Sequence, residues 1–193
     1  KDEIKKSHLN EESQRPYFLF VGNLEARKNV VGLLKAFELF CQQTKNTETD
    51  LVIIGKPGFG HDKIKSTYEG LSVKQQVIFP GFVSGERLQQ YYSSALAFVY
   101  PSFYEGFGLP VVEALLSRTP VITSNTSSLP EAAGNHSILI NPNDSNEIKE
   151  AILQVLGDTE LQEKMIEKGY EYALNRFGKS RLTSELMSLY RKL

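Results

Sequence analysis

Two glutamates, Glu105 and Glu113, are the residues of this sequence whose type and spacing first suggest chemistry. Seven residues separate them within the segment PSFYEGFGLPVVE, which runs from 101 to 113. A carboxylate can accept two hydrogen bonds at once, so each glutamate is suited to binding the paired hydroxyls of a sugar. Because like charges so near each other repel, we expect the two glutamates to have different roles.

The pattern around these glutamates predicts a strand, a glycine turn and a helix. The apolar run 95–100 is typical of a buried strand, and Pro110 is favoured in the first turn of a helix, here continuing through Leu116. Three backbone N–H groups at the start of this helix lack helical acceptors, and the helix dipole favours an anion or a polarised oxygen there. These three residues are Phe107, Gly108 and Leu109.

A basic pair follows the first predicted strand, which covers 17–21. The loop that comes next, 22–29, contains Arg27 and Lys28 immediately before a predicted helix. A diphosphate bound there would meet a guanidinium fork, an ammonium group and the helix dipole together. A solvated basic pair without a ligand is the competing interpretation.

A second glycine-rich loop, 55–60, follows the predicted strand 51–54 and contains Lys56. The carboxyl ends of parallel strands share one edge of a sheet, so the loops after the first, second and fourth strands, with the basic pair, Lys56 and Glu105, are expected at the same edge. A flexible turn with an exposed lysine is an equally good interpretation of this loop.

Neither glycine turn matches a nucleotide-binding motif of another class. The loop 22–29 lacks the glycine and the hydroxyl residue that flank the lysine of a P-loop. The turn 106–108 lacks the third glycine of a dinucleotide-binding fingerprint, because Val111 stands in its place. Both NTPase and dehydrogenase functions are therefore disfavoured.

Apolar segments alternate with helical patterns along most of the chain. We predict an α/β fold: a Rossmann-like parallel six-stranded sheet with helices on both faces and right-handed crossovers. Ser128 is predicted to cap a short helix with Glu131 as its partner, and Asp144 to cap the next one. The strands are expected at 17–21, 51–54, 76–79, 95–100, 120–123 and 137–140, and the helices from about 29, at 62–71, 84–93, 110–116 and 129–133, from 144, and at 159–175 and 180–192.

Composition narrows the function classes. The 193 residues fit one domain, and a net charge of -1 argues against nucleic-acid binding, which needs a basic face. Cys41 falls on the apolar face of a predicted helix, and the three histidines have no acidic partner at ligand spacing, so no metal is expected. No apolar run approaches the ~20 residues needed to cross a bilayer, and no signal peptide opens the chain, so we expect it in the cytoplasm or at the inner face of the membrane.

The sequence resembles the retaining GT-B glycosyltransferases of family 4, the group 1 glycosyl transferases. The resemblance rests on EGFGLP followed by the second glutamate, on the Arg-Lys-Asn triplet at 27–29 and on the segment 127–134, which occur in the family's order. In the family the first glutamate contacts the transferred sugar and the second contacts the ribose, which by position are Glu105 and Glu113. The family's Arg and Lys bind the diphosphate, which by position are Arg27 and Lys28.

The resemblance also implies further contacts with the nucleotide. Many members carry an arginine where this chain has Asn23, so the phosphate contact of that arginine does not carry over directly to this position. The strand end 77–81 resembles the family's base-contacting segment. The residues expected to be catalytic are Glu105, Arg27 and Lys28, and those expected to bind the donor are Gly22, Asn23, Arg27, Lys28, Lys56, Ile78, Phe107, Gly108, Leu109 and Glu113.

The function that the resemblance implies is transfer of a hexosyl group, with retention, from a nucleoside-diphosphate sugar to a saccharide or lipid-linked acceptor. Likeness to bacterial polysaccharide mannosyltransferases favours mannose, and the donor is expected to be GDP- or UDP-linked, with no metal and no other cofactor. Residues 1–16 are expected to be a linker from a missing N-terminal domain, and 17–193 the donor-binding domain with its C-terminal helices. That missing domain would bind the acceptor and could attach to a membrane surface, so this domain alone is not expected to transfer sugar.

Two alternatives from other classes remain open at this point. One is a non-catalytic module that binds sugar nucleotides or a partner. The other is a GT-B protein with epimerase or phosphorylase chemistry, which the paired glutamates and the lack of a lysine-bound cofactor motif disfavour.

Overall fold

The computed structural model describes residues 15–178 and, beyond them, Arg181, Thr183, Met187 and Tyr190. Within this range the chain forms one parallel sheet of six strands in the order β3-β2-β1-β4-β5-β6. The strands are β1 (Tyr17–Val21), β2 (Asp50–Ile54), β3 (Val77–Gly81), β4 (Ala97–Tyr100), β5 (Val121–Ser124) and β6 (Ile138–Ile140).

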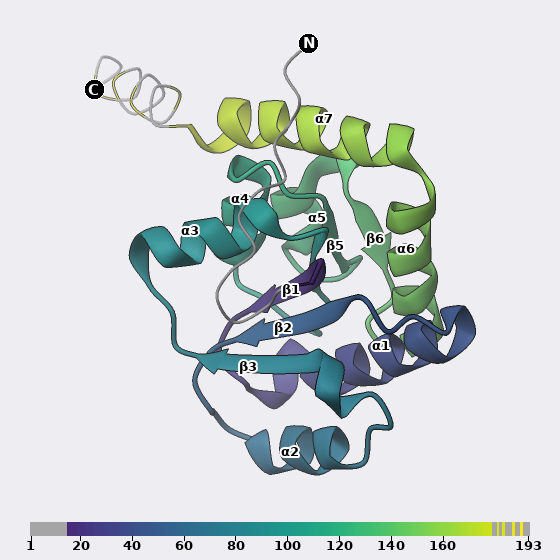
Figure 1. Ribbon diagram of the computed structural model, residues 1–193. Helices are drawn as coiled ribbons and strands as arrows, with labels where there is room; N and C mark the ends of the chain where they lie inside the picture. Colours follow the sequence, from purple (N-terminus) through teal and green to yellow (C-terminus); the bar gives the residue numbers. More distant parts are fainter. Residues whose placement is uncertain (1–14, 179–180, 182, 184–186, 188–189, 191–193) are drawn as a thin grey trace.

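Helices cover both faces of the sheet (Figure 1). Right-handed crossovers put the helices that link β1 to β2 and β2 to β3 on one face, and those that lead from β3 across to β4, β5 and β6 on the other. On the first face α1 packs against α2 and α6, and on the second α4 packs against α5 and α7. The helices are α1 (Val30–Thr44), α2 (His61–Glu69), α3 (Gly85–Ser94), α4 (Leu109–Leu116), α5 (Leu129–Ala133), α6 (Ser145–Gly157) and α7 (Thr159–Phe177).

The central strands are buried on both faces, as parallel strands between two helical layers should be. All residues of β2 and β4 are buried, and so are the first four of β1. Tyr100 stacks on Phe20 and Phe98, with ring centroids 5.6 and 5.4 Å apart. Aromatic rings thus fill the centre of the core close to the carboxyl ends of β1 and β4.

The strand order reverses between β1 and β4, which are neighbours in the sheet. The chain leaves β1 toward one face of the sheet and β4 toward the other, so the loops that follow these two neighbouring strands begin side by side at the carboxyl edge. The first of them contains a short 3₁₀ helix, η1 (Ala26–Lys28), and the second leads into α4. The loops with the candidate residues therefore meet at the switch point of the sheet.

The predicted fold class is confirmed, and most element boundaries differ by one or two residues. One correction concerns the strand expected at 95–100, which begins only at Ala97. Ala95 still donates to the carbonyl of Tyr92 at the end of α3, so it belongs to the helix cap. Gln76, expected in a strand, lies in the 3₁₀ helix η2 (Lys74–Gln76). The helix expected at 180–192 lies almost wholly outside the described residues.

Two loops approach each other so closely that one position must be glycine. A Cβ atom on Gly55, just after β2, would lie 1.9 Å from the carbonyl oxygen of Gly22, just after β1. That oxygen is part of the backbone, so the clash could be relieved only by separating the two loops.

We predict that Gly55→Ala destabilises the chain by about 1–3 kcal/mol, the usual cost of forcing an extra carbon into a packed site. Gly106→Ala is the matched control, because no atom lies within 4 Å of a Cβ built there. Urea unfolding of both variants measures the difference. Equal free energies of unfolding would contradict the close approach of the loops.

Candidate active site at the switch point of the sheet

The carboxylate of Glu105 lies at the centre of the site. Its Oε1 atom accepts from Lys28 Nζ at 2.7 Å and from the Tyr100 hydroxyl at 3.1 Å, and Oε2 accepts from Arg27 Nη1 at 2.9 Å. Lys28 Nζ also donates to the Tyr100 hydroxyl. Glu105 and Lys28 are buried, whereas the Arg27 side chain is 46% exposed. We call Arg27, Lys28, Tyr100 and Glu105 the switch-point cluster.

The structure rejects the interpretation of Arg27 and Lys28 as a solvated basic pair. Lys28 is among the few buried charged residues of the described chain. Its aliphatic part is covered, and its ammonium group lies 4.9 Å from the centroid of the Tyr100 ring. Arg27 donates through Nε to Glu25 and through Nη1 to the carbonyl of Tyr104 as well as to Glu105. Both cations are held in fixed positions by neighbouring groups.

Electrostatics keep the Glu105 carboxyl ionised. Burial by itself would raise the pKa of Glu105, but the hydrogen bond and the charge of Lys28, helped by the hydrogen bond from Arg27, bring this pKa below its ordinary value. Burial and the nearby negative charge of Glu105 raise the pKa of Tyr100 far above the ordinary phenol value. Tyr100 therefore remains a neutral donor at any working pH.

The turn after β4 is held from both sides. The amide of Phe103 donates to the Arg27 carbonyl at 2.8 Å, which ties the turn to the loop after β1. Ser127 accepts from the Glu105 amide at 3.1 Å, and the Ser128 hydroxyl donates to the Glu105 carbonyl at 2.9 Å. Ser127 has a φ of 54°, in the left-handed region that non-glycine residues seldom adopt. The backbone of the loop after β5 is therefore strained at the residue that makes one of these contacts.

These contacts correct the capping box expected at Ser128 and Glu131. Ser128 precedes α5, but its side chain makes no capping hydrogen bond and instead supports Glu105. The Glu131 carboxylate pairs with Arg176 of α7 at 3.0 Å. The capping by Asp144 is confirmed, because its carboxylate accepts from the amides of Asn146 and Glu147.

The start of α4 has the free donors that were predicted. Among the described residues, the amides of Phe107, Gly108 and Leu109 have no hydrogen-bond acceptor. Gly108 has a φ of 100°, and a Cβ there would lie 2.9 Å from a methyl carbon of Leu129. A glycine is therefore needed to turn the chain into the helix with these amides open.

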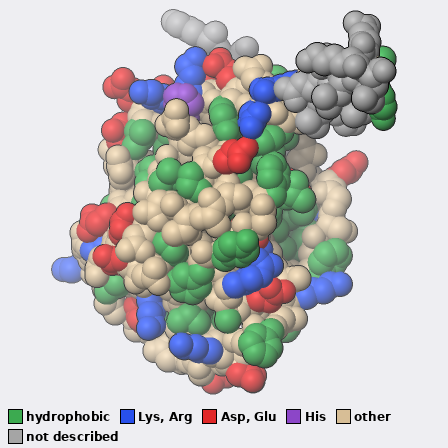
Figure 2. Space-filling model, turned by 180° about the vertical axis from the view of Figure 1, so that it is seen from behind, with side chains coloured by type: hydrophobic (Ala, Val, Ile, Leu, Met, Phe, Trp, Pro, Cys, Tyr) green, Lys and Arg blue, Asp and Glu red, His purple; other side chains and the backbone are tan. Residues whose placement is uncertain are grey.

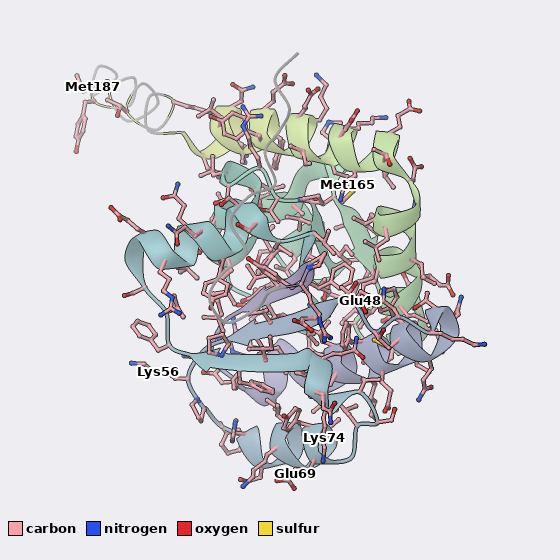
Figure 3. The ribbon with its side chains drawn as sticks, in the orientation of Figure 1. Glu48, Lys56, Glu69, Lys74, Met165 and Met187 are labelled. Carbon is pink, nitrogen blue, oxygen red and sulfur yellow. The ribbon has the colours of Figure 1, made fainter. Side chains whose placement is uncertain are left out.

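The loops after β1 and β2 are joined by backbone hydrogen bonds. Leu24 donates to the carbonyl of Lys56 at 2.8 Å, and Ala26 to that of Phe59 at 3.0 Å. Lys56 is exposed beside the carboxyl ends of β2 and β3 (Figure 3), and its Nζ lies 4.3 Å from the centroid of the Phe82 ring. The structure thus brings this loop to the expected edge of the sheet.

The remaining predicted residues lie around the cluster without joining it. Gly22 and Asn23 begin the loop after β1, with Asn23 exposed, and Ile78 is half-buried in β3. Glu113 is exposed on α4, and its Oε2 accepts from the Tyr92 hydroxyl at 3.0 Å. The two glutamates therefore differ: Glu105 is held by cations, and Glu113 by a neutral phenol.

Three residues of the site, Tyr92, Tyr100 and Ser127, were missed from the sequence, and Ser128 was assigned the wrong role. A tyrosine at the last position of an otherwise apolar strand was a signal for Tyr100, because the hydroxyl of a buried tyrosine needs a partner. Nothing in the local pattern pointed to the partner of Tyr92, which is 21 residues away on another helix.

The described residues contain no group of three histidine, cysteine or acidic side chains that could hold a metal ion. None of their helices is long and apolar enough to cross a bilayer. Acidic and basic side chains are interspersed on the face seen from behind (Figure 2).

A comparison with protein families assigns the chain. Residues 1–172 match the model of the family described as glycosyl transferases group 1. The chain belongs to the group 1 glycosyl transferases. The resemblance first seen in the glutamate motif is thereby confirmed at the level of the family.

This group 1 glycosyl transferase chain is similar in sequence or structure to several known proteins. It is 36% identical over 177 residues to the O-antigen chain mannosyltransferase B of Escherichia coli. This alignment covers 92% of this chain and 46% of that protein. Sucrose-phosphate synthase from Thermosynechococcus elongatus superimposes with a TM-score of 0.81 at 27% identity, over 93% of this chain and 45% of that one. HepE from Anabaena, solved in complex with UDP and glucose, shares the fold with a TM-score of 0.81 at 20% identity, over 93% of this chain and 49% of that one. The chain thus spans about half the length of these proteins.

The switch-point cluster makes a pH-dependent prediction for this glycosyl transferase chain. The pKa of Glu105 is lowered in the folded state, so its stabilising contribution is present above the ordinary value of 4.5 and is lost as the pH falls through the lowered folded value. We expect Glu105→Gln to cost about 1.5–3 kcal/mol at pH 7, where it removes charged hydrogen bonds, and the gap to the unmodified chain to narrow below pH 4.5.

Urea unfolding at a series of pH values measures this gap. Glu131→Gln is the matched control, because that glutamate forms an exposed surface pair that should contribute about 0–1 kcal/mol. A gap for Glu105→Gln that stays constant down to pH 3.5, or one no larger than the control's at pH 7, would contradict the described cluster.

Proposed function

We propose that this chain is the donor-binding domain of a retaining glycosyltransferase that uses a nucleoside-diphosphate sugar. The observation that carries the proposal is the meeting of Arg27 and Lys28 with the turn that opens α4, where three amides have no acceptor. Cationic side chains and a helix N-terminus at the switch point of an α/β sheet suit a diphosphate.

The cluster retains hydrogen-bond donors for that diphosphate. A guanidinium has five N–H donors, and the Nη2 group of Arg27 makes no hydrogen bond with the described residues. Lys28 directs two of its three N–H donors at Glu105 and Tyr100, which leaves one. Donors that are already fixed can stabilise the charge that develops on a departing diphosphate without first reorganising.

In this proposal Glu105 faces the transferred sugar. Its carboxylate has four lone-pair positions, and Lys28, Tyr100 and Arg27 donate to three of them. The fourth, on Oε2, can accept one sugar hydroxyl. Its other function is to hold the two cations in place. Glu113 binds the ribose, and the end of β3 around Ile78, with Lys56 beside it, lies toward the base.

The sugar is proposed to be mannose, from a GDP- or UDP-linked donor, because the Escherichia coli relative is named a mannosyltransferase. The acceptor is proposed to be a saccharide or a lipid-linked saccharide, consistent with the O-antigen chain in that relative's name. Because the chain spans about half of its relatives, we propose that a second domain supplies the acceptor site and that transfer requires both. Closure of two domains on the donor would exclude water and position the acceptor.

A calorimetric screen of UDP-, GDP- and ADP-sugars against this chain tests the donor proposal. The sugar nucleotide with one of these bases should bind clearly better than those with the other two, and the free sugar should not bind. Failure of every nucleoside-diphosphate sugar to bind would contradict the proposed function.

We predict that Arg27→Ala and Lys28→Ala each weaken binding of the nucleoside diphosphate about ten- to hundredfold, because each removes a charge-assisted hydrogen bond of ~1.5–3 kcal/mol. Binding of the corresponding nucleoside, which has no phosphate, should change much less. Isothermal titration with both ligands measures the ratio.

Lys35→Ala is the matched control, because Lys35 is an exposed cation on the helix that follows the same loop. It removes one positive charge and should leave both affinities unchanged. If Arg27→Ala lowers the affinities for the diphosphate and the nucleoside in parallel, the variant damages the fold and these cations do not contact phosphate.

A further inference from the structure

Tyr92 is a buried aromatic residue whose hydroxyl reaches a residue of the proposed donor site. It lies near the end of α3, and its side chain is 2% exposed. The ring packs edge-to-face against Phe98 of β4, with centroids 5.4 Å apart and an interplanar angle of 62°. Its carbonyl accepts from the Thr119 hydroxyl at 2.7 Å. Ring and backbone are therefore held by the core.

The hydroxyl of Tyr92 donates to Oε2 of Glu113 at 3.0 Å. Glu113 lies on the exposed side of α4, and Oε1 has no hydrogen-bond partner among the described residues. An exposed glutamate ordinarily samples several rotamers and loses that freedom when it binds a ligand. A bond to a rigid neighbour removes part of this loss in advance.

The hydroxyl of Tyr92 stays protonated. Burial, with a smaller effect of the Glu113 charge, raises the pKa of Tyr92 far above the ordinary phenol value. The phenol is therefore a hydrogen-bond donor, and Oε2 of Glu113 is its acceptor. Three lone-pair positions of the carboxylate remain, which is enough for both hydroxyls of a vicinal diol.

We infer that Tyr92 is a positioning residue that orients the Glu113 carboxylate for the ribose diol of the donor. The inference rests on the proposed function, in which Glu113 binds the ribose. Tyr92 itself does not contact the ligand. It fixes the plane of the carboxylate, so that Oε1 and the open side of Oε2 face the 2′- and 3′-hydroxyls together.

A purely structural role would be a different outcome. If the hydrogen bond only ties α3 to α4, its loss would lower stability and would alter the binding of all ligands equally or not at all. A positioning role predicts an effect confined to ligands with the ribose diol. The discrimination between a ribonucleotide and its 2′,3′-dideoxy analogue therefore separates the two roles.

The experiment is isothermal titration of GDP and UDP, and of their 2′,3′-dideoxy analogues, into this chain and four variants. These are Tyr92→Phe, Glu113→Ala, the double variant, and Tyr172→Phe as a control. Tyr172 donates to the Glu131 carbonyl from α7, so the control removes a tyrosine hydroxyl bond that involves neither glutamate of the motif.

Tyr92→Phe is expected to weaken binding of the ribonucleotide roughly three- to tenfold, because part of the ordering of one glutamate side chain is lost. The dideoxy analogue should bind as before, and Tyr92→Phe should have no further effect when Glu113 is already alanine. Tyr172→Phe should leave every affinity unchanged. Equal ribonucleotide affinities for Tyr92→Phe and the unmodified chain, or parallel losses for both ligands, would overturn the inference.

The Glu113→Ala variant distinguishes this failure from failure of the proposed function. One outcome is that Glu113→Ala abolishes the preference for the ribonucleotide over its dideoxy analogue while Tyr92→Phe leaves that preference unchanged. In that case Glu113 binds the ribose, and only the role of Tyr92 is wrong. If Glu113→Ala retains the full preference, or neither GDP nor UDP binds the unmodified chain, the proposed function itself is contradicted.

Discussion

The ion pairs of Glu105 are the interaction on which the site depends. A buried carboxylate or ammonium group costs several kcal/mol unless it is paired, so neither Glu105 nor Lys28 could stay buried without the other. The two residues are 77 positions apart in the sequence and come together only because β1 and β4 are neighbours. The order of the strands, the loop after β1 and the turn into α4 are thus linked through one carboxylate.

This arrangement also explains how two cations can be held beside each other in the site. Arg27 and Lys28 would repel each other if Glu105 and Glu25 did not lie beside them. With these carboxylates in place the cations are held at fixed positions, and the Arg27 side chain remains partly exposed. The same carboxylates limit how much net positive charge a diphosphate would meet, so hydrogen-bond geometry and the free amides of α4 must contribute a large part of its binding.

Much of the fold could be predicted from the sequence because its strands are continuous apolar runs between glycine and proline turns. The order of the loops along one edge followed from the alternation of strands and helices, and with it the proximity of Arg27, Lys28 and Glu105. The contacts inside the site could not be predicted in the same way. That Glu105 binds both cations, and that Ser128 supports it in place of capping α5, depends on side-chain positions that no local periodicity encodes.

In the proposed function, the amides at the start of α4 and the neighbouring cations receive the diphosphate of the donor. Backbone amide NMR shifts of Phe107, Gly108 and Leu109, followed while this chain is titrated with GDP or UDP and then with the matching nucleoside, test it most directly. These three signals should move with the diphosphate and stay in place with the nucleoside. Saturable binding of the diphosphate that leaves all three signals unmoved would contradict it.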